Sequence, residues 1–310
     1  MRVIHAQGLL WSVLLAGAAA AAPAPAACPE RITASFEVRG GTLCTAIDES
    51  APSDQQRLLR DWVLRSAQIV ASYYGRFPAR QVVLEIHTSA GVGVHGGHTN
   101  NDPRLKIDVT VGRDTGAADL AKDWVLVHEM IHLALPEVGR RHDWLAEGLA
   151  TYVEGIARAR SGNRTVADLW AEYRASMTRG LPQPGEGGLD QSPTWARTYW
   201  GGALFCLQSD VRLREQTGNR AGLETALRAI LNATGGYASE RDIGDVLRIG
   251  DEATGTRVLQ GLYRDTATTA VAPDLDGLWA RLGVPPDPAT QPFDDHAPLA
   301  AIRKAITGSP

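Results

Sequence analysis

The sequence is poor in lysine and has no long basic run. Lysine occurs only at positions 106, 122 and 304, and the formal net charge is −4 with an isoelectric point of about 6.1. Binding to nucleic acids or anionic membranes by bulk electrostatics is therefore not indicated. Of the 310 residues, 44% are hydrophobic and 21% are charged. These ordinary fractions exclude wholesale disorder and allow one large domain or two modest ones.

No segment has the length of a confident membrane span. The apolar stretch from Leu9 to about Ala20 is too short and too rich in alanine. Arg2 precedes this stretch, and small residues and prolines with Ala-x-Ala cleavage options follow it. This layout predicts a secretory signal peptide over residues 1–27. We therefore expect an exported protein, periplasmic or secreted, with no transmembrane segment in the mature chain. The bias toward alanine and arginine is typical of bacteria with high GC content.

Cysteine is scarce, with three residues in the chain. Cys28 and Cys44 flank two short extended segments around Gly40–Gly41, so residues 28–50 are expected to form a strand or hairpin segment. In an oxidising compartment a disulfide between these two cysteines is plausible. Cys206 lies in the apolar run ALFCL and is expected to be a buried small hydrophobe rather than a reactive thiol.

The apolar pattern changes from strand-like to helical along the chain. The segment QVVLEIHT is a strand candidate, and the glycine- and histidine-rich segment SAGVGVHGGHTNNDP after it predicts a loop. In residues 105–111 apolar and polar residues alternate, which predicts a strand with one wet face. From about Gly116 the pattern is helical almost to the end. The sum is an α+β fold, with a small mixed sheet followed by a mostly helical C-terminal half.

The segment DWVLVHEMIH contains His128, Glu129 and His132 in the pattern His-Glu-x-x-His. Apolar residues at three- and four-residue steps predict one helix over residues 117–135. Two histidines four positions apart lie one above the other on such a helix and can hold one metal ion. Glu129 lies beside them, where it can accept a proton from a metal-bound water. The alternative is a pair of buried histidines with an incidental glutamate.

A catalytic zinc site needs a third protein ligand and one open position. The metzincin pattern fails, because Leu135 stands where its glycine belongs. His142 and Asp143 are near in sequence but come after a turn, at the start of the next helix. Glu147 is the better candidate, since an antiparallel second helix would present it to the histidine pair.

These residues resemble those of a known enzyme class. His128-Glu129-x-x-His132 followed by WLAEGLATYVE is similar to the gluzincin metallopeptidases, in particular the aminopeptidase N and glycyl aminopeptidase families. The resemblance implies a zincin, thermolysin-like fold and one Zn²⁺ per chain, held by His128, His132 and Glu147, with Glu129 as the general base. The connection from His132 to Glu147 is a few residues shorter than is usual in those families. Glu154 is expected near the site or at the surface rather than among the ligands.

A second resemblance concerns Tyr199. The segment TYWGGALF is similar to the Tyr-x-x-Gly segment of these families, whose tyrosine donates a hydrogen bond to the oxyanion. The resemblance therefore implies a catalytic role for Tyr199. The alternative is a core tyrosine, since Gly201–Gly202 predicts a closely packed helix there.

Together these patterns predict an exported zinc metallopeptidase that acts on peptide or protein substrates. The alternative is a catalytically inactive, exported binding protein with the zincin fold. We expect residues 105–111 to be the sheet edge along which a peptide adds as another strand. The segment GGHTNND lacks the amine-binding glutamate of aminopeptidase N relatives. His95 before it and His98 within it could contact substrate or bind a second metal, and the alternative is a mobile polar loop.

The predicted parts of the chain are a signal peptide, 1–27; an N-terminal strand segment, 28–50; the zincin sheet and metal-binding helices, 51–179; a Pro/Gly-rich linker, 180–194; a helical subdomain, 195–283; and a C-terminal tail, 284–310.

Overall fold

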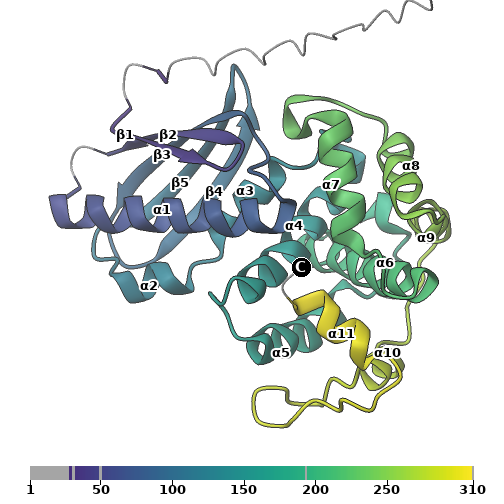
Figure 1. The fold of residues 1–310 in the computed structure, drawn as a ribbon. Coiled ribbons are helices and arrows are strands. Elements are labelled where there is room, and N and C mark those ends of the chain that lie inside the picture. The colour runs from purple at the N-terminus through teal and green to yellow at the C-terminus, as the bar shows by residue number, and fades with distance from the viewer. Residues whose placement is uncertain (1–27, 30–31, 49–50, 193, 309–310) are drawn as a thin grey trace, which may run out of the picture.

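The structure is a computed structural model that describes residues 28–29, 32–48, 51–192 and 194–308. The predicted signal peptide lies outside the described residues. A five-stranded sheet in the N-terminal part is followed by helices to the end of the chain (Figure 1). This arrangement confirms the predicted α+β fold. Within the described part of the chain, no helix is long and apolar enough to cross a bilayer.

The sheet has the strand order β1-β2-β3-β5-β4. Strands β2 and β3 and strands β3 and β5 pair in parallel, whereas the two outer pairs are antiparallel. The strands are β1 (Ala34–Val38), β2 (Gly41–Ile47), β3 (Gln81–Ser89), β4 (Val94–Asn101) and β5 (Leu105–Gly112). Parallel pairing within a short sheet needs long crossovers, and helix α1 (Ser53–Tyr74) supplies the first of them across one face of the sheet (Figure 1).

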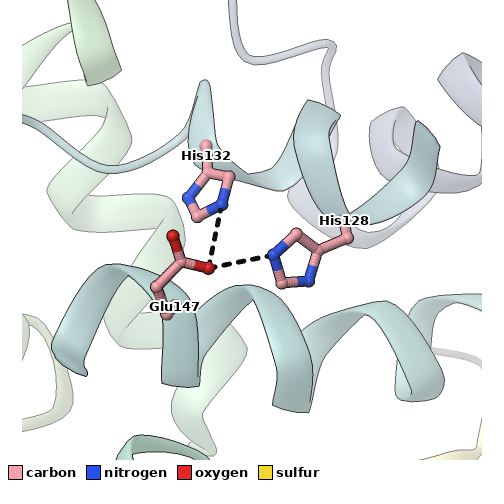
Figure 2. A group of neighbouring side chains, drawn as sticks. All are labelled: His128, His132 and Glu147. Carbon is pink, nitrogen blue, oxygen red and sulfur yellow. Dashed lines mark hydrogen bonds and ion pairs between the residues drawn. The ribbon is translucent and has the colours of Figure 1, made fainter. Parts of the chain in front are cut away.

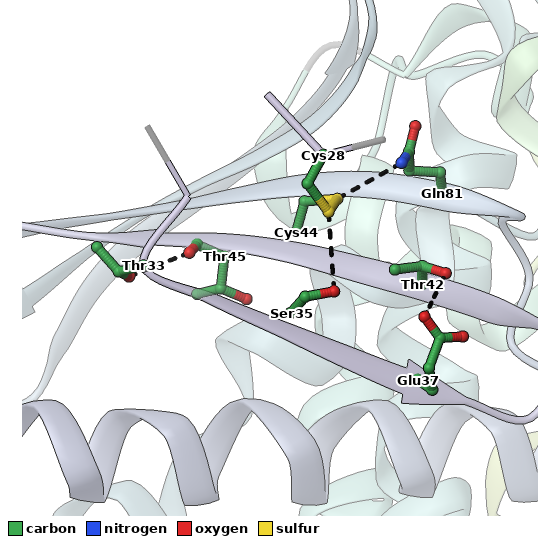
Figure 3. Close-up of a disulfide and its surroundings, with 8 residues drawn as sticks. All are labelled: Cys28, Thr33, Ser35, Glu37, Thr42, Cys44, Thr45 and Gln81. Carbon is green, nitrogen blue, oxygen red and sulfur yellow. Dashed lines mark hydrogen bonds between the residues drawn. A yellow bond between two sulfur atoms is a disulfide. The ribbon is translucent and has the colours of Figure 1, made fainter. Parts of the chain in front are cut away.

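The predicted disulfide is present. Cys28 and Cys44 are joined with a Cα–Cα distance of 5.6 Å, which ties the start of the described chain to β2 (Figure 3). The Gln81 side-chain amide donates to the Cys44 sulfur at 3.5 Å. Cys206 is a buried free cysteine, as the sequence predicts.

The edge strand next to β5 is β4, so the prediction that residues 105–111 form a sheet edge is wrong. Strand β5 lies inside the sheet, between β3 and β4. The segment expected to be a glycine- and histidine-rich loop forms β4, with a register shift between Val94 and Gly96. Glycine has little intrinsic strand preference, so hydrogen bonding to β5 rather than local propensity makes this segment a strand.

The helix predicted over residues 117–135 is two helices. Helix α2 (Ala117–Lys122) ends before Asp123, and helix α3 (Val125–His132) begins two residues later. The Asp123 carboxylate accepts hydrogen bonds from the backbone N–H groups of Val125 (3.0 Å) and Leu126 (3.2 Å), so it caps α3. It also accepts from the Trp62 indole at 3.1 Å, which anchors the break to α1.

The rest of the chain packs around two central helices, α4 (Asp143–Arg160) and α6 (Gly202–Thr217) (Figure 1). The other helices are α5 (Val166–Ser176), α7 (Leu223–Thr234), α8 (Ile243–Thr254), α9 (Val258–Thr266), α10 (Leu275–Leu282) and α11 (Ala300–Thr307). Short non-α helices are η1 (Arg140–His142), η2 (Met177–Gly180), η3 (Leu189–Gln191), the π-helical η4 (Arg197–Gly201) and η5 (Gly236–Ala238). One apolar core connects the sheet with these helices.

The segment expected to be a linker, residues 180–194, contacts the helices through Asp190. The Asp190 carboxylate is buried and accepts hydrogen bonds from the Trp144 indole (3.0 Å) and the Tyr263 hydroxyl (2.9 Å). It also lies 2.9 Å from His142 Nδ1. The segment is therefore fixed to the start of α4 and to α9. The division of the chain into domains remains a prediction.

Candidate metal centre

Helices α3 and α4 bring His128, His132 and Glu147 together (Figure 2). The His128 Nε2 and His132 Nε2 atoms lie 3.1 Å and 3.5 Å from Glu147 Oε2. His128 is buried and the other two are partly buried. Both rings therefore converge on the same carboxylate oxygen, although 19 residues separate His128 from Glu147.

The donor set fits a zinc ion. Zinc bonds to histidine nitrogen and carboxylate oxygen are about 2.0–2.1 Å, so donor atoms in a tetrahedral site lie roughly 3.3 Å apart. The two histidine–Glu147 distances, 3.1 Å and 3.5 Å, bracket that value. Three protein donors of this kind leave one tetrahedral position free, which is the ligand count of a catalytic zinc site rather than a structural one.

The protonation of Glu147 and His128 also suits a metal. Burial by itself would raise the pKa of Glu147, but hydrogen bonds from His128 and His132 lower it well below its usual value. Burial lowers the pKa of His128. Burial would also lower the pKa of His132, but the hydrogen bond with Glu147 raises it, so zinc would have to displace a proton from that ring. An ionised carboxylate and a neutral imidazole are the forms that ligate zinc.

Gly148 lies at the contact between α4 and α6. A Cβ atom at this position would lie 2.2 Å from the Gly202 Cα atom of α6. A Cβ atom on Gly202 would in turn lie 1.9 Å from the Trp144 carbonyl oxygen of α4. The two glycines thus allow α4 and α6 to pack backbone to backbone. This packing sets the π-helical turn that carries Tyr199 close to Glu147.

Glu129 is held by the edge strand. Thr99 Oγ1 lies 2.7 Å from Glu129 Oε2 and 3.0 Å from its backbone oxygen, and both residues are buried. A Cβ atom at Gly97 would lie 2.6 Å from Glu129 Cγ, so only glycine leaves room for this side chain. Sequence reasoning missed Thr99, because its contact with Glu129 depends on the strand that was expected to be a loop.

Tyr199 lies beside the same centre. Its ring stacks on His128 with centroids 6.0 Å apart and on Trp195 with centroids 4.6 Å apart. Burial, and then the carboxylates of Glu147 and Glu129, raise the pKa of Tyr199 above its usual value. The hydroxyl group therefore stays protonated at neutral pH and can donate a hydrogen bond.

Five other candidates lie outside this ligand group. His142 contacts Asp190, and His95 contacts Ser89 Oγ at 2.9 Å. His98 and Asp143 line a cavity next to the centre. Glu154 is buried and pairs with Arg158, so it is neither at the surface nor bonded to an imidazole.

A second group of potential ligand atoms occurs on the sheet. Glu85, His87 and Asp108 lie together there. The Lys106 ammonium group is 3.3 Å from Glu85 and 3.1 Å from Asp108, so it already compensates the two carboxylates.

Two cavities flank the centre, and Tyr199 lines both. The larger, of about 710 Å³, is bounded at the centre by His128. The smaller, of about 460 Å³, is bounded by Glu129, His132 and Glu147. An extended ligand that crossed the centre could therefore occupy space on both sides of it.

No protein-family model matches the sequence, and no curated protein matches it. Solved structures do match the fold. An aminopeptidase N family protein from Idiomarina loihiensis aligns with a TM-score of 0.57 and 13% identity, over 81% of this chain and 49% of that one. The M1 zinc metallopeptidase from Deinococcus radiodurans aligns with a TM-score of 0.51 and 15% identity, over 79% of this chain and 53% of that one. The chain thus spans about half the length of these structures. It has the gluzincin-like fold of the M1 zinc metallopeptidases, as the motifs predict.

Proposed function

We propose that the protein is a zinc-dependent peptidase that hydrolyses peptide bonds, with one zinc ion held by His128, His132 and Glu147. The observation that carries this proposal is the convergence of the three donor atoms within 4.8 Å of one another. The fold shared with M1 zinc metallopeptidases supports it. When bound, zinc would act as a Lewis acid that lowers the pKa of a coordinated water toward about 7.

The proton transfers are assigned to Glu129. Its carboxylate lies on the turn between the two histidines, and the hydrogen bond from Thr99 fixes one of its oxygens. From this place it can accept a proton from the attacking water and pass it to the leaving amine. The strand that holds Thr99 is also the sheet edge, so a bound peptide could extend along it.

Stabilisation of the oxyanion is assigned to Tyr199. Its hydroxyl group donates a hydrogen bond to the substrate carbonyl oxygen as that oxygen gains negative charge. Because burial and then the neighbouring carboxylates raise the pKa of Tyr199, the hydroxyl donor is present throughout the neutral pH range.

The direct test is the variant Glu129→Gln. Its zinc content, measured by atomic emission, should equal that of the wild type, whereas hydrolysis of a mixed peptide library should fall by at least a hundredfold, on the order of the effect of removing a general base. The exposed Glu252 lines neither cavity and provides a matched control, because Glu252→Gln makes the same chemical change outside the site. Hydrolysis by Glu129→Gln at the wild-type rate would exclude the proposed mechanism. Zinc binding without hydrolysis by any form would favour the inactive binding protein.

Export to the periplasm or medium is part of the proposal and depends on the N-terminal sequence. Mass spectrometry of the N-terminus of protein recovered from a periplasmic fraction would test it. A chain that begins before residue 28 and remains in the cytoplasm would contradict it.

A further inference from the structure

We propose that the larger cavity beside the metal centre binds the side chain of an arginine or lysine residue next to the cleaved bond. This inference rests on the proposed peptidase function and extends it to the chemical class of the substrate.

The cavity leads from the metal centre to a buried ion pair. His128 and Tyr199 line one end of it, and Thr151, Glu154 and Arg158 follow Glu147 at successive turns of α4. At a rise of 1.5 Å per residue, Glu154 lies about 10 Å further along the helix axis than Glu147. The volume of about 710 Å³ is within the usual range for ligand pockets. A long side chain could therefore reach from the centre to Glu154.

One carboxylate oxygen of this ion pair is free to accept a further hydrogen bond. Glu154 is 6% exposed, and its Oε1 accepts a hydrogen bond from Arg158 at 2.7 Å. Among the described residues, its Oε2 has no hydrogen-bond donor. Arg158 also donates to Asn163 Oδ1 (2.7 Å) and to the Lys122 carbonyl oxygen (3.2 Å). The cation is thus well satisfied, whereas the carboxylate can accept another donor.

The pKa of Glu154 is consistent with the binding of a second cation. Burial raises the pKa of Glu154 to about 7, because Arg158 offsets only part of the cost of burying the charge. A second cation beside the carboxylate would stabilise its ionised form.

The walls of the cavity suit an aliphatic stem with a positive end. Trp124 and Trp195 line the cavity and are 48% and 59% exposed. Trp124 packs edge-on against His128, and Trp195 stacks on Tyr199. Tryptophan faces attract cations, and the methylene groups of arginine and lysine pack on apolar surface. A neutral apolar side chain would instead cover Glu154 Oε2 without giving it a donor.

Arg158 and Arg164 line the cavity in ion pairs with Glu154 and Glu172. Two further cations line it without such a pair, and they lead to the opposite expectation. Lys122 and Arg179 are exposed, and no carboxylate of the described residues forms an ion pair with either. They would favour an acidic substrate residue. Because both are solvated, water and salt screen them, whereas Glu154 is buried and acts through a lower dielectric. The buried carboxylate should therefore dominate the preference.

The experiment uses alanine hexapeptides with one central guest residue: arginine, lysine, citrulline, norleucine or glutamate. Citrulline has nearly the shape of arginine without its charge. Product masses and kcat/KM are measured with the zinc-loaded wild type, and Kd is measured by calorimetry with the zinc-loaded Glu129→Gln variant. Compared with the citrulline peptide, we expect the arginine peptide to have a kcat/KM about tenfold or more higher and a Kd about tenfold or more lower, as for one charge-assisted hydrogen bond.

The variant Glu154→Gln should abolish the difference between arginine and citrulline, because the amide can still accept from Arg158 but carries no charge. Glu252→Gln is the matched control. It also removes a glutamate from an i,i+4 ion pair with an arginine, the exposed pair of Glu252 with Arg248 on α8. It should retain the difference. The wild-type comparison decides the matter even if Glu154→Gln does not fold.

The possible failures can be told apart. Cleavage without a basic preference, or with a preference for glutamate or norleucine, would overturn the pocket assignment and leave the peptidase proposal standing. Glu154-dependent binding of the arginine peptide without cleavage of any peptide would support the pocket assignment and reject the peptidase proposal.

Discussion

At the scale of single residues, the contact between Thr99 and Glu129 decides how the proposed base is oriented. The Thr99 hydroxyl lies 2.7 Å from Glu129 Oε2 in a buried setting. Thr99→Val keeps the shape of the side chain and removes this donor. We expect kcat to fall about tenfold with little change in KM, because the misplaced base acts in the chemical step.

Thr99→Ser is the matched control, since it keeps the hydroxyl group and should retain most of the activity. Zinc content should be equal in both variants. Equal rates for the valine and serine variants, or loss of zinc from the valine variant alone, would contradict a positioning role for Thr99.

The sequence predicts the candidate ligands far better than their supports. His128 and His132 are brought together by helical spacing alone, and Glu147 lies in a recognisable motif, so the three meet as expected. Thr99 and Trp195 reach the centre only through strand pairing and helix packing between distant segments. No local pattern indicates such contacts.

At the scale of secondary structure elements, the close packing of α4 on α6 aligns Glu147 with Tyr199. A Cβ atom at Gly148 would lie 2.2 Å from Gly202 Cα, so Gly148→Ala would push the two backbones apart. We expect a loss of about 2 kcal/mol or more in the free energy of unfolding, as for other overpacked sites. Zinc affinity should fall with it, because Glu147 is the preceding residue.

Gly261→Ala provides the control for this prediction. Gly261 lies within α9, and no atom within 4 Å would meet an added Cβ atom. This change should be neutral or stabilise the protein by up to about 1 kcal/mol, through helix propensity. Chemical denaturation of both variants measures the difference, and equal stabilities would show that the glycine contact is unimportant.

Two predictions of secondary structure were wrong, and each has an identifiable physical cause. The apolar pattern over residues 117–135 is continuous, but the Asp123 side chain caps a new helix within it. Strand β4 carries glycines and histidines that favour no strand by themselves. The Asp123 hydrogen bonds outweigh the helical pattern in the first case, and pairing with β5 outweighs the weak strand preference in the second.

At the scale of the whole molecule, zinc should stabilise the fold because its ligands come from two helices. A ligand present at a hundred times its Kd adds about 2.7 kcal/mol to the stability of the folded state, or roughly 5 °C in Tm for a domain of this size. Removal of zinc by a chelator should lower the Tm by about this amount, as measured by scanning calorimetry, and added zinc should restore it. An equal zinc-dependent shift in His128→Ala would place the stabilising ion elsewhere.

The α+β architecture could be predicted because the strand-like patterns lie before about Gly116 and the pattern after it is helical. The packing of residues 180–194 against α4 and α9 could not be predicted. That segment is rich in proline and glycine, yet the buried Asp190 ties it to α4 and α9. One well-satisfied buried carboxylate can fix a segment whose composition indicates a linker.

The central claim is that His128, His132 and Glu147 hold one zinc ion on an open site. Anomalous diffraction at the zinc absorption edge from crystals of the zinc-loaded protein tests it most directly. We predict one strong peak about 2.0–2.1 Å from both histidine Nε2 atoms and from a Glu147 oxygen, with a non-protein ligand in the remaining position. A peak at Glu85, His87 and Asp108 instead, or a fourth protein ligand that closes the site, would contradict the account.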